Sequence, residues 1–137
     1  MKKLLFVFFI TLISCTNNFK QANYYFIKGL NDYEKENKVS ALKNYQKAYD
    51  LDKKNIKIVR EIAYLYANLG DVEKAEEFYK KALQLDPHDE NSLENLLKIL
   101  YTKKDIENIE KYSNQILDKN SLLYKHSQLK LKNLKNK

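Results

Sequence analysis

Apolar positions along the chain fall into two patterns. Residues 4–13 are almost continuously apolar, with Thr11 as the polar exception, and they follow Lys2 and Lys3. From residue 22 onward, apolar residues are spaced as on amphipathic helices, which bury one face and expose charge on the other. The chain has only two Gly and one Pro, and β-rich folds use both in turns, so helices are favoured. We therefore predict an all-α protein with helices near residues 22–35, 38–51, 56–69, 72–85, 90–102 and 105–118.

An internal repeat sets the spacing of these helices. Residues 36–55 align with residues 70–89 at a shift of 34, and a further shift aligns 70–73 with 104–107. The identical pairs of the first alignment are Ala41/Ala75, Tyr45/Tyr79, Lys47/Lys81, Ala48/Ala82, Leu51/Leu85 and Asp52/Asp86. A fixed period of this length is the signature of a stacked repeat protein, in which each unit packs on its neighbours.

The period and these residues resemble the tetratricopeptide repeat (TPR) family. The resemblance implies units at 22–55, 56–89 and 90–123, each a hairpin of helix A and helix B. Small residues at the crossing, Gly29 against Ala41 and Ala63 against Ala75, would let the two helix axes approach closely. The chain departs from the family pattern at Asp32 and Lys53, where Tyr and Pro are expected, and at Leu97 and Ile109, where small residues are expected.

A final helix is predicted over residues 121–137. Leu123, Tyr124, Ser127, Leu131 and Leu134 share one arc of a helical wheel, with Lys125 and Lys132 opposite. Because a solenoid needs a terminal helix with one polar face, this segment is expected to cap the third unit. The expected fold is a TPR-type solenoid of helical hairpins, with about three repeats plus this capping helix.

The excess of positive over negative charge lies almost entirely in the same terminal segment. The net charge is +7, and residues 119–137 hold six lysines and no acidic residue. This basic face is either the solvated side of the cap or a contact for anionic lipid headgroups. Lysines in one tail, without interleaved arginine, make a poor surface for reading bases, so we expect no nucleic-acid partner.

The N-terminal pattern is that of a targeting segment. A ten-residue helix rises about 15 Å, half of the roughly 30 Å hydrocarbon core of a bilayer, so residues 1–14 are expected to be a signal peptide. The adjoining Leu12-Ile13-Ser14-Cys15 resembles the lipobox of bacterial lipoproteins. That resemblance implies cleavage before Cys15, lipid (diacylglycerol and palmitate-type acyl chains) on Cys15, and a tether over 15–21. It implies a location in the bacterial cell envelope.

Within the envelope, the outer membrane is favoured because Thr16 is not the Asp that marks inner-membrane retention in some bacteria. The choice between a periplasmic and a surface-exposed face stays open. Apart from the covalent lipid on Cys15, no cofactor is expected. The two histidines, His88 and His126, lie near no acidic cluster, so no metal site is predicted. We find no phosphate-binding glycine loop or nucleophile motif, and we expect a protein that is not an enzyme.

What remains is a protein- or peptide-binding surface. In the TPR family the A helices line a groove, and the resemblance places its positions at Asn23, Phe26, Leu30, Tyr33, Lys57, Arg60, Tyr64, Asn68, Asn91, Glu94, Lys98 and Tyr101. Tyr and Arg are enriched in interface hot spots. Phe26 and Leu30 could equally pack on neighbouring helices, and they stand where the family's carboxylate clamp needs Lys and Asn. We expect a membrane-anchored adaptor in an envelope assembly; the alternative is a cell-surface lipoprotein that contacts host or environmental molecules.

Overall fold

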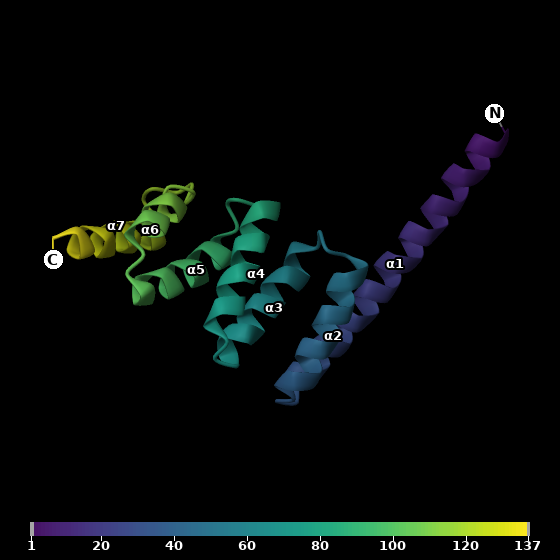
Figure 1. Cartoon of the computed structure of the whole chain (residues 1–137), viewed down its shortest axis with the longest axis horizontal. Coiled ribbons are helices and arrows are strands. Elements are labelled where there is room, and N and C mark those ends of the chain that lie inside the picture. Colours follow the sequence, from purple (N-terminus) through teal and green to yellow (C-terminus); the bar gives the residue numbers. More distant parts are fainter. Residues whose placement is uncertain (1, 137) are drawn as a thin grey trace. The chain divides into compact units, whose positions relative to one another are not determined.

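A computed structural model describes the backbone of residues 2–136 and the side chains of residues 18–136, and it is helical throughout, with no strand in the part described (Figure 1). The helices are α1 (Lys2–Glu34), α2 (Lys38–Leu51), α3 (Ile56–Asn68), α4 (Val72–Leu85), α5 (Glu90–Lys103), α6 (Ile106–Ser113) and α7 (Leu122–Lys135). The predicted all-α class is confirmed.

The chain divides into two compact units, Met1–Leu65 and Tyr66–Lys137, with the boundary inside α3. In the first unit α1 packs along α2. In the second unit α4 packs on α5, α5 on α6, and α6 on α7. Short connections between these helices produce the hairpins that the repeat period predicts.

The three turns from helix A to helix B have the same backbone geometry. Glu36, Gly70 and Lys104 all adopt positive φ, at 61°, 82° and 55°. In each turn the next residue donates its N–H to a carbonyl five residues earlier: Asn37 to Asp32, Asp71 to Tyr66 and Asp105 to Leu100. This left-handed residue reverses the chain after each A helix. The 34-residue period is therefore kept in the third repeat, residues 90–123, although the sequence of that repeat has diverged.

The same period governs how the B helices begin. The side chains of Asn37, Asp71 and Asp105 accept hydrogen bonds from backbone N–H groups three residues on, and so cap α2, α4 and α6. A helix N-terminus leaves four N–H groups without partners, and a capping oxygen satisfies one of them. Turn and cap together determine where each hairpin closes.

Close packing of α1 on α2 depends on Gly29. A Cβ built at Gly29 would overlap the Tyr45 ring and lie 3.3 Å from the carbonyl oxygen of Ala41. Ala41 and Tyr45 are fully buried, as are their counterparts Ala75 and Tyr79 on α4. The prediction that small residues meet where the two helices cross is confirmed for Gly29 and Ala41 of the first repeat. The Tyr45 ring fills the space beside this crossing.

Asp32, which departs from the TPR pattern, is hydrogen-bonded to two residues of α2. Its Oδ2 accepts hydrogen bonds from Ser40 Oγ at 2.5 Å and from Asn44 Nδ2 at 2.7 Å, both on α2. These bonds hold the pKa of Asp32 below its ordinary value, with Ser40 as the largest cause. A polar link between α1 and α2 thus replaces the aromatic residue that the family uses.

The terminal helix packs as its pattern predicts. Ser127 and Leu131 are buried, and Leu123, Tyr124 and Leu134 are half-buried, whereas Lys125 and Lys132 are exposed. Ser121 caps the helix by accepting from the Tyr124 N–H. Helix α7 covers α6 and also contacts α5.

Two predicted boundaries differ from the structure. Helix α6 ends at Ser113, not near residue 118, since the next residues turn and Lys119 donates to the carbonyl oxygens of Asn114 and Ile116 at 3.1 and 2.6 Å. Helix α1 begins at Lys2, not near residue 22, and runs through the predicted tether at 15–21. No Gly or Pro occurs before Gly29 to interrupt it.

The signal peptide and lipid predictions concern side chains that the structure does not describe. The side chain of Cys15, like those of the rest of residues 1–17, lies outside the described set. Among the residues that could be searched, no helix is both long and apolar enough to cross a membrane. Cleavage and lipidation stay predictions.

Candidate functional site

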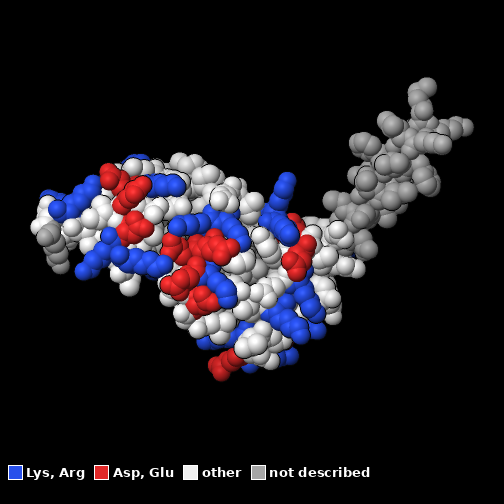
Figure 2. All heavy atoms as spheres, viewed as in Figure 1, with Lys and Arg blue, Asp and Glu red and all other residues white. Residues whose placement is uncertain are grey.

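The predicted groove residues of the first unit lie on α1 and α3 and differ in exposure. Asn23 and Lys57 are exposed, and Tyr64 is 42% exposed. Phe26, Leu30, Tyr33 and Arg60 are half-buried. The predicted groove residues of this unit therefore offer a partner both aromatic and charged groups. Elsewhere too charges alternate in sign, since Figure 2 shows acidic and basic side chains interspersed on the face in view.

Tyr33 of α1 and Tyr64 of α3 are in contact on this surface. Their ring centroids are 6.1 Å apart at an interplanar angle of 64°, an edge-to-face arrangement. A hydrogen bond between the two side chains is the largest cause that raises the pKa of Tyr33, followed by burial. Tyr33 also lines an open hollow of about 730 Å³ with Glu34, Glu36 and Lys38. The pair brings together residues 31 positions apart in the sequence.

Phe26 contributes more to packing than to the surface. Its ring lies 5.6 Å from the ring of the buried Tyr45 on α2. Of the two interpretations that the sequence left open for Phe26, the structure favours packing on a neighbouring helix. Because Phe26 is half-buried, part of its ring is still accessible to a partner.

Glu61 belongs to the same surface and was not among the predicted groove residues. It is half-buried on α3, and burial raises its pKa, with the Arg60 charge acting in the opposite direction. Its negative charge also contributes to the raised pKa values of Tyr33 and Tyr45. The sequence did offer one indication that Glu61 belongs to this surface: it lies three residues before Tyr64, and residues with this spacing share a helix face.

In the second compact unit, Tyr66–Lys137, three predicted groove residues of the third repeat line one recess. Glu94, Lys98 and Tyr101 of α5 surround a hollow of about 100 Å³ together with Leu97 and with Leu123, His126 and Lys130 of α7. Glu94 and Lys98 are exposed and form an ion pair at 2.7 Å. Asn68 and Asn91 are exposed but do not line this recess. The α7 residues were predicted only as part of a cap.

Tyr101 forms one wall of the recess. The Lys130 ammonium lies 4.5 Å from the centre of the Tyr101 ring, within the range of a cation–π contact. The Tyr101 hydroxyl is buried near Ser113 and Ser127 without a well-formed hydrogen bond to either. Burial raises the pKa of Tyr101, and the two serines reduce that shift. The side chain is thus held between α5, α6 and α7.

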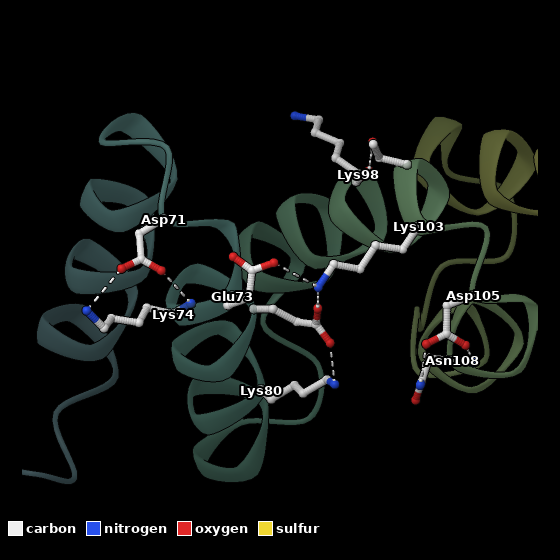
Figure 3. A network of polar contacts seen from close by, with 10 residues as sticks. Asp71, Glu73, Lys74, Lys80, Lys98, Lys103, Asp105 and Asn108 are labelled. Carbon is white, nitrogen blue, oxygen red and sulfur yellow. Dashed lines mark hydrogen bonds and ion pairs between the residues drawn. The ribbon is translucent and has the colours of Figure 1, made fainter.

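A separate ionic network links α4 to α5. Glu76 of α4 accepts from Lys80 at 2.5 Å and from Lys103 of α5 at 2.6 Å. Figure 3 shows Lys103 joined to Glu73 and to a second carboxylate, that of Glu76, which also contacts Lys80, while Lys98 points away from this network. The side chain of Glu76 is only 14% exposed, so these bonds are better shielded than ordinary surface pairs. They join α4 to α5, and none of these residues lines the recess.

The geometry offers a binding surface, and within the described residues no group of three or more His, Cys, Asp and Glu side chains could hold a metal ion. Comparison with known proteins agrees on the fold. Residues 60–89 match the family model of the tetratricopeptide repeat, so this segment is similar to a TPR unit. Together with the seven helices, this defines a TPR-type helical-hairpin solenoid.

Three solved structures have a similar fold. The first TPR of Spaghetti (RPAP3) bound to HSP90 peptide SRMEEVD superposes with a TM-score of 0.69 at 18% identity, covering 86% of this chain and 93% of that one. The Arabidopsis OM64 TPR domain gives 0.65 at 16% identity, with 85% and 98% covered. The MamA protein gives 0.64 at 22% identity, with 72% and 54% covered.

Two curated proteins are similar in sequence. Both are photosystem I assembly proteins Ycf3 from Synechococcus, strains CC9605 and CC9311. They are 28% and 29% identical over 90 and 98 residues, which is 64% and 69% of this chain. The chain spans about half the length of these relatives, 52% and 56%.

Proposed function

We propose that the protein is a membrane-anchored adaptor that holds a protein partner against the A-helix faces of its TPR repeats, within a bacterial envelope assembly. The observation that carries the binding role is the Tyr33–Tyr64 pair, an aromatic cluster at the surface with Arg60 on the same helix as Tyr64. Stacked helical repeats present extended concave surfaces for partners. Tyr and Arg anchors supply much of the energy of such interfaces.

The relatives support this role in general terms. The Ycf3 proteins are named for the assembly of a complex, and the RPAP3 domain was solved with a bound peptide. The RPAP3 domain shares the fold of this chain, and TPR folds are generally interaction modules, not enzymes. We therefore place the chain among proteins that act by binding, with a partner of its own.

The anchoring part of the proposal rests on the sequence. Leu12-Ile13-Ser14-Cys15 behind a ten-residue apolar run supplies a thiol for lipidation at a membrane surface. Two or three acyl chains give stable anchoring, because each buried methylene contributes about 0.8 kcal/mol. We propose attachment to the outer membrane.

Recovery of partners from crosslinked membranes tests the binding role. Tagged wild-type chain is compared with an Arg60→Glu, Tyr64→Ala double variant, and co-purifying proteins are quantified by mass spectrometry. The control, Val39→Ala with Lys43→Glu, makes a similar change at exposed positions of α2. We expect partner loss with the first variant only. Equal recovery from all three proteins would remove the Tyr33–Tyr64 surface from the proposal.

The anchor is tested separately by Cys15→Ser. We expect the wild-type mature chain to start at residue 15, to carry the mass of attached lipid, and to sediment with membranes. The variant should lack the lipid mass and leave the membrane fraction. A variant that stays membrane-bound, while the wild type shows no lipid mass, would refute lipid anchoring at Cys15.

A further inference from the structure

We propose that the recess between α5 and α7 binds a carboxylate side chain from an acidic segment of the protein partner. The proposal rests on the adaptor function above and gives the partner a chemical character. The recess is lined by Glu94, Leu97, Lys98 and Tyr101 from α5, and by Leu123, His126 and Lys130 from α7. It lies wholly within the second unit.

The size of the recess selects a side chain over a free metabolite. Its volume is about 100 Å³. Pockets for small molecules and cofactors usually measure roughly 300–1,000 Å³, and one water molecule takes up about 30 Å³ in the liquid. The recess thus has room for a group the size of a few waters, such as the end of an Asp or Glu side chain.

The chemistry of the wall selects an anion. Lys98, His126 and Lys130 can all donate hydrogen bonds, and Lys98 and Lys130 carry positive charge. The floor, formed by Leu97 and Leu123, would receive the methylene groups of the entering side chain. Lys130 stays over the Tyr101 ring at 4.5 Å, so its ammonium is already positioned at the wall. A charge-assisted hydrogen bond from a positioned donor is stronger than a neutral one.

Glu94 is the single acidic residue of the lining, and it behaves as an internal competitor. It pairs with Lys98 at 2.7 Å, with the two side chains 50% and 62% exposed. Exposed pairs of this kind contribute roughly 0–1 kcal/mol, so an incoming carboxylate can replace Glu94 at little cost. Neutralising Glu94 should therefore strengthen binding, which a purely structural ion pair would not do.

The rest of α7 favours a protein ligand over a lipid surface. Lys119 is engaged with carbonyl oxygens and with the Tyr124 ring, and Lys135 pairs with Glu110. Lys125, Lys130 and Lys132 are all exposed, and Lys125 and Lys132 lie on the arc opposite the buried leucines, as a flat membrane would require. Lys130 differs from them because it lines the recess between two helices and its ammonium lies over the Tyr101 ring. A recess admits one side chain, whereas a bilayer needs an open face.

Binding of a defined peptide tests the proposal. The probe is fluorescein-labelled Ser-Glu-Leu-Glu-Ser with both ends blocked, and its control is the same peptide with Gln in place of each Glu. Binding to the full chain is followed by fluorescence anisotropy. We expect Lys130→Gln to weaken binding of the Glu peptide about three- to tenfold, in line with loss of one charged contact. Glu94→Gln should tighten it about two- to threefold.

Lys132→Gln is the matched control, since it removes the same charge from an exposed position two residues away on α7. Its effect should stay below twofold. Equal weakening by Lys130→Gln and Lys132→Gln would overturn the proposal, as would equal affinity for the Gln peptide. Loss of binding to vesicles of three parts phosphatidylcholine and one part phosphatidylglycerol in Lys130→Gln, with peptide affinity unchanged, would assign the recess to lipid instead.

These outcomes are distinct from failure of the adaptor role. If partners co-purify with the wild type but not with the Arg60→Glu, Tyr64→Ala variant, the adaptor role stands whatever the peptide does. If the Glu peptide binds in the recess as expected and no partner is ever recovered from membranes, the adaptor role fails while the anion site stands.

Discussion

Replacing Gly29 by Ala should destabilise the protein, although alanine is the better helix former. In the interior of a helix, Gly→Ala ordinarily gains about 0.8–1 kcal/mol. Here the new Cβ would overlap the Tyr45 ring, which is 1% exposed and has little space to move into. Overpacking of a tight core usually costs about 1–3 kcal/mol. Subtracting the helix gain leaves a net loss of about 1 kcal/mol in the free energy of unfolding, and of no more than about 2 kcal/mol.

Urea unfolding of the full chain, followed by far-UV circular dichroism, measures this loss. With a denaturant slope of about 2 kcal/mol per molar, the midpoint should fall by roughly 0.5 M, and by no more than about 1 M. Asn31→Ala, at an exposed position of the same helix, is the control and should change stability by less than about 0.5 kcal/mol. A Gly29→Ala protein as stable as the wild type would show that α1 and α2 do not need the glycine.

A double-mutant cycle identifies the cause of the loss. Tyr45→Leu removes the ring that the Cβ would meet, at the cost of leaving space in the core. In that background Gly29→Ala should be less harmful, with a coupling energy of at least about 0.5 kcal/mol between the two positions. Additive effects would place the cost elsewhere, for example at the Ala41 carbonyl oxygen 3.3 Å away.

Three further changes test other contacts. Glu76→Gln should lower the free energy of unfolding by about 1 kcal/mol in the same urea assay, because Lys80 and Lys103 both lose their carboxylate partner. Glu77→Gln is the control and should have little effect, since the Glu77 side chain is 57% exposed in its pair with Lys81. Asp32, whose pKa is lowered by its hydrogen bonds, contributes stability that is present above its unfolded pKa and lost as the pH falls through its folded pKa. Asp32→Asn should therefore reduce the acid dependence of the thermal midpoint below about pH 4, and an unchanged acid slope would contradict this assignment. Lys104→Gly should raise stability by about 0.5–1 kcal/mol, since it relieves a non-glycine residue at φ 55°; a lower thermal midpoint would contradict it.

Part of the candidate site could be predicted from sequence, because repeat period determines which residues share a helix face. Tyr33 and Tyr64 were assigned to one surface, and the structure brings their rings together. Glu61 was missed because its half-burial depends on neighbours, which a face assignment does not show. His126 and Lys130 were assigned to a cap, and only the contact of α7 with α5 shows that they also line a recess.

The sequence by itself determined the helical class, the period of 34 and the apolar arc of α7, although not the start of α1 or the end of α6, since these features depend on local spacing and on which side chains avoid water. It could not show that Glu36 and Lys104 adopt the same left-handed turn as Gly70, because neither residue type favours positive φ. Nor could it explain Asp32, whose partners Ser40 and Asn44 reach it only when α2 folds back on α1. Tertiary packing decided those features, because it places donors, rings and charges from separate helices within contact distance.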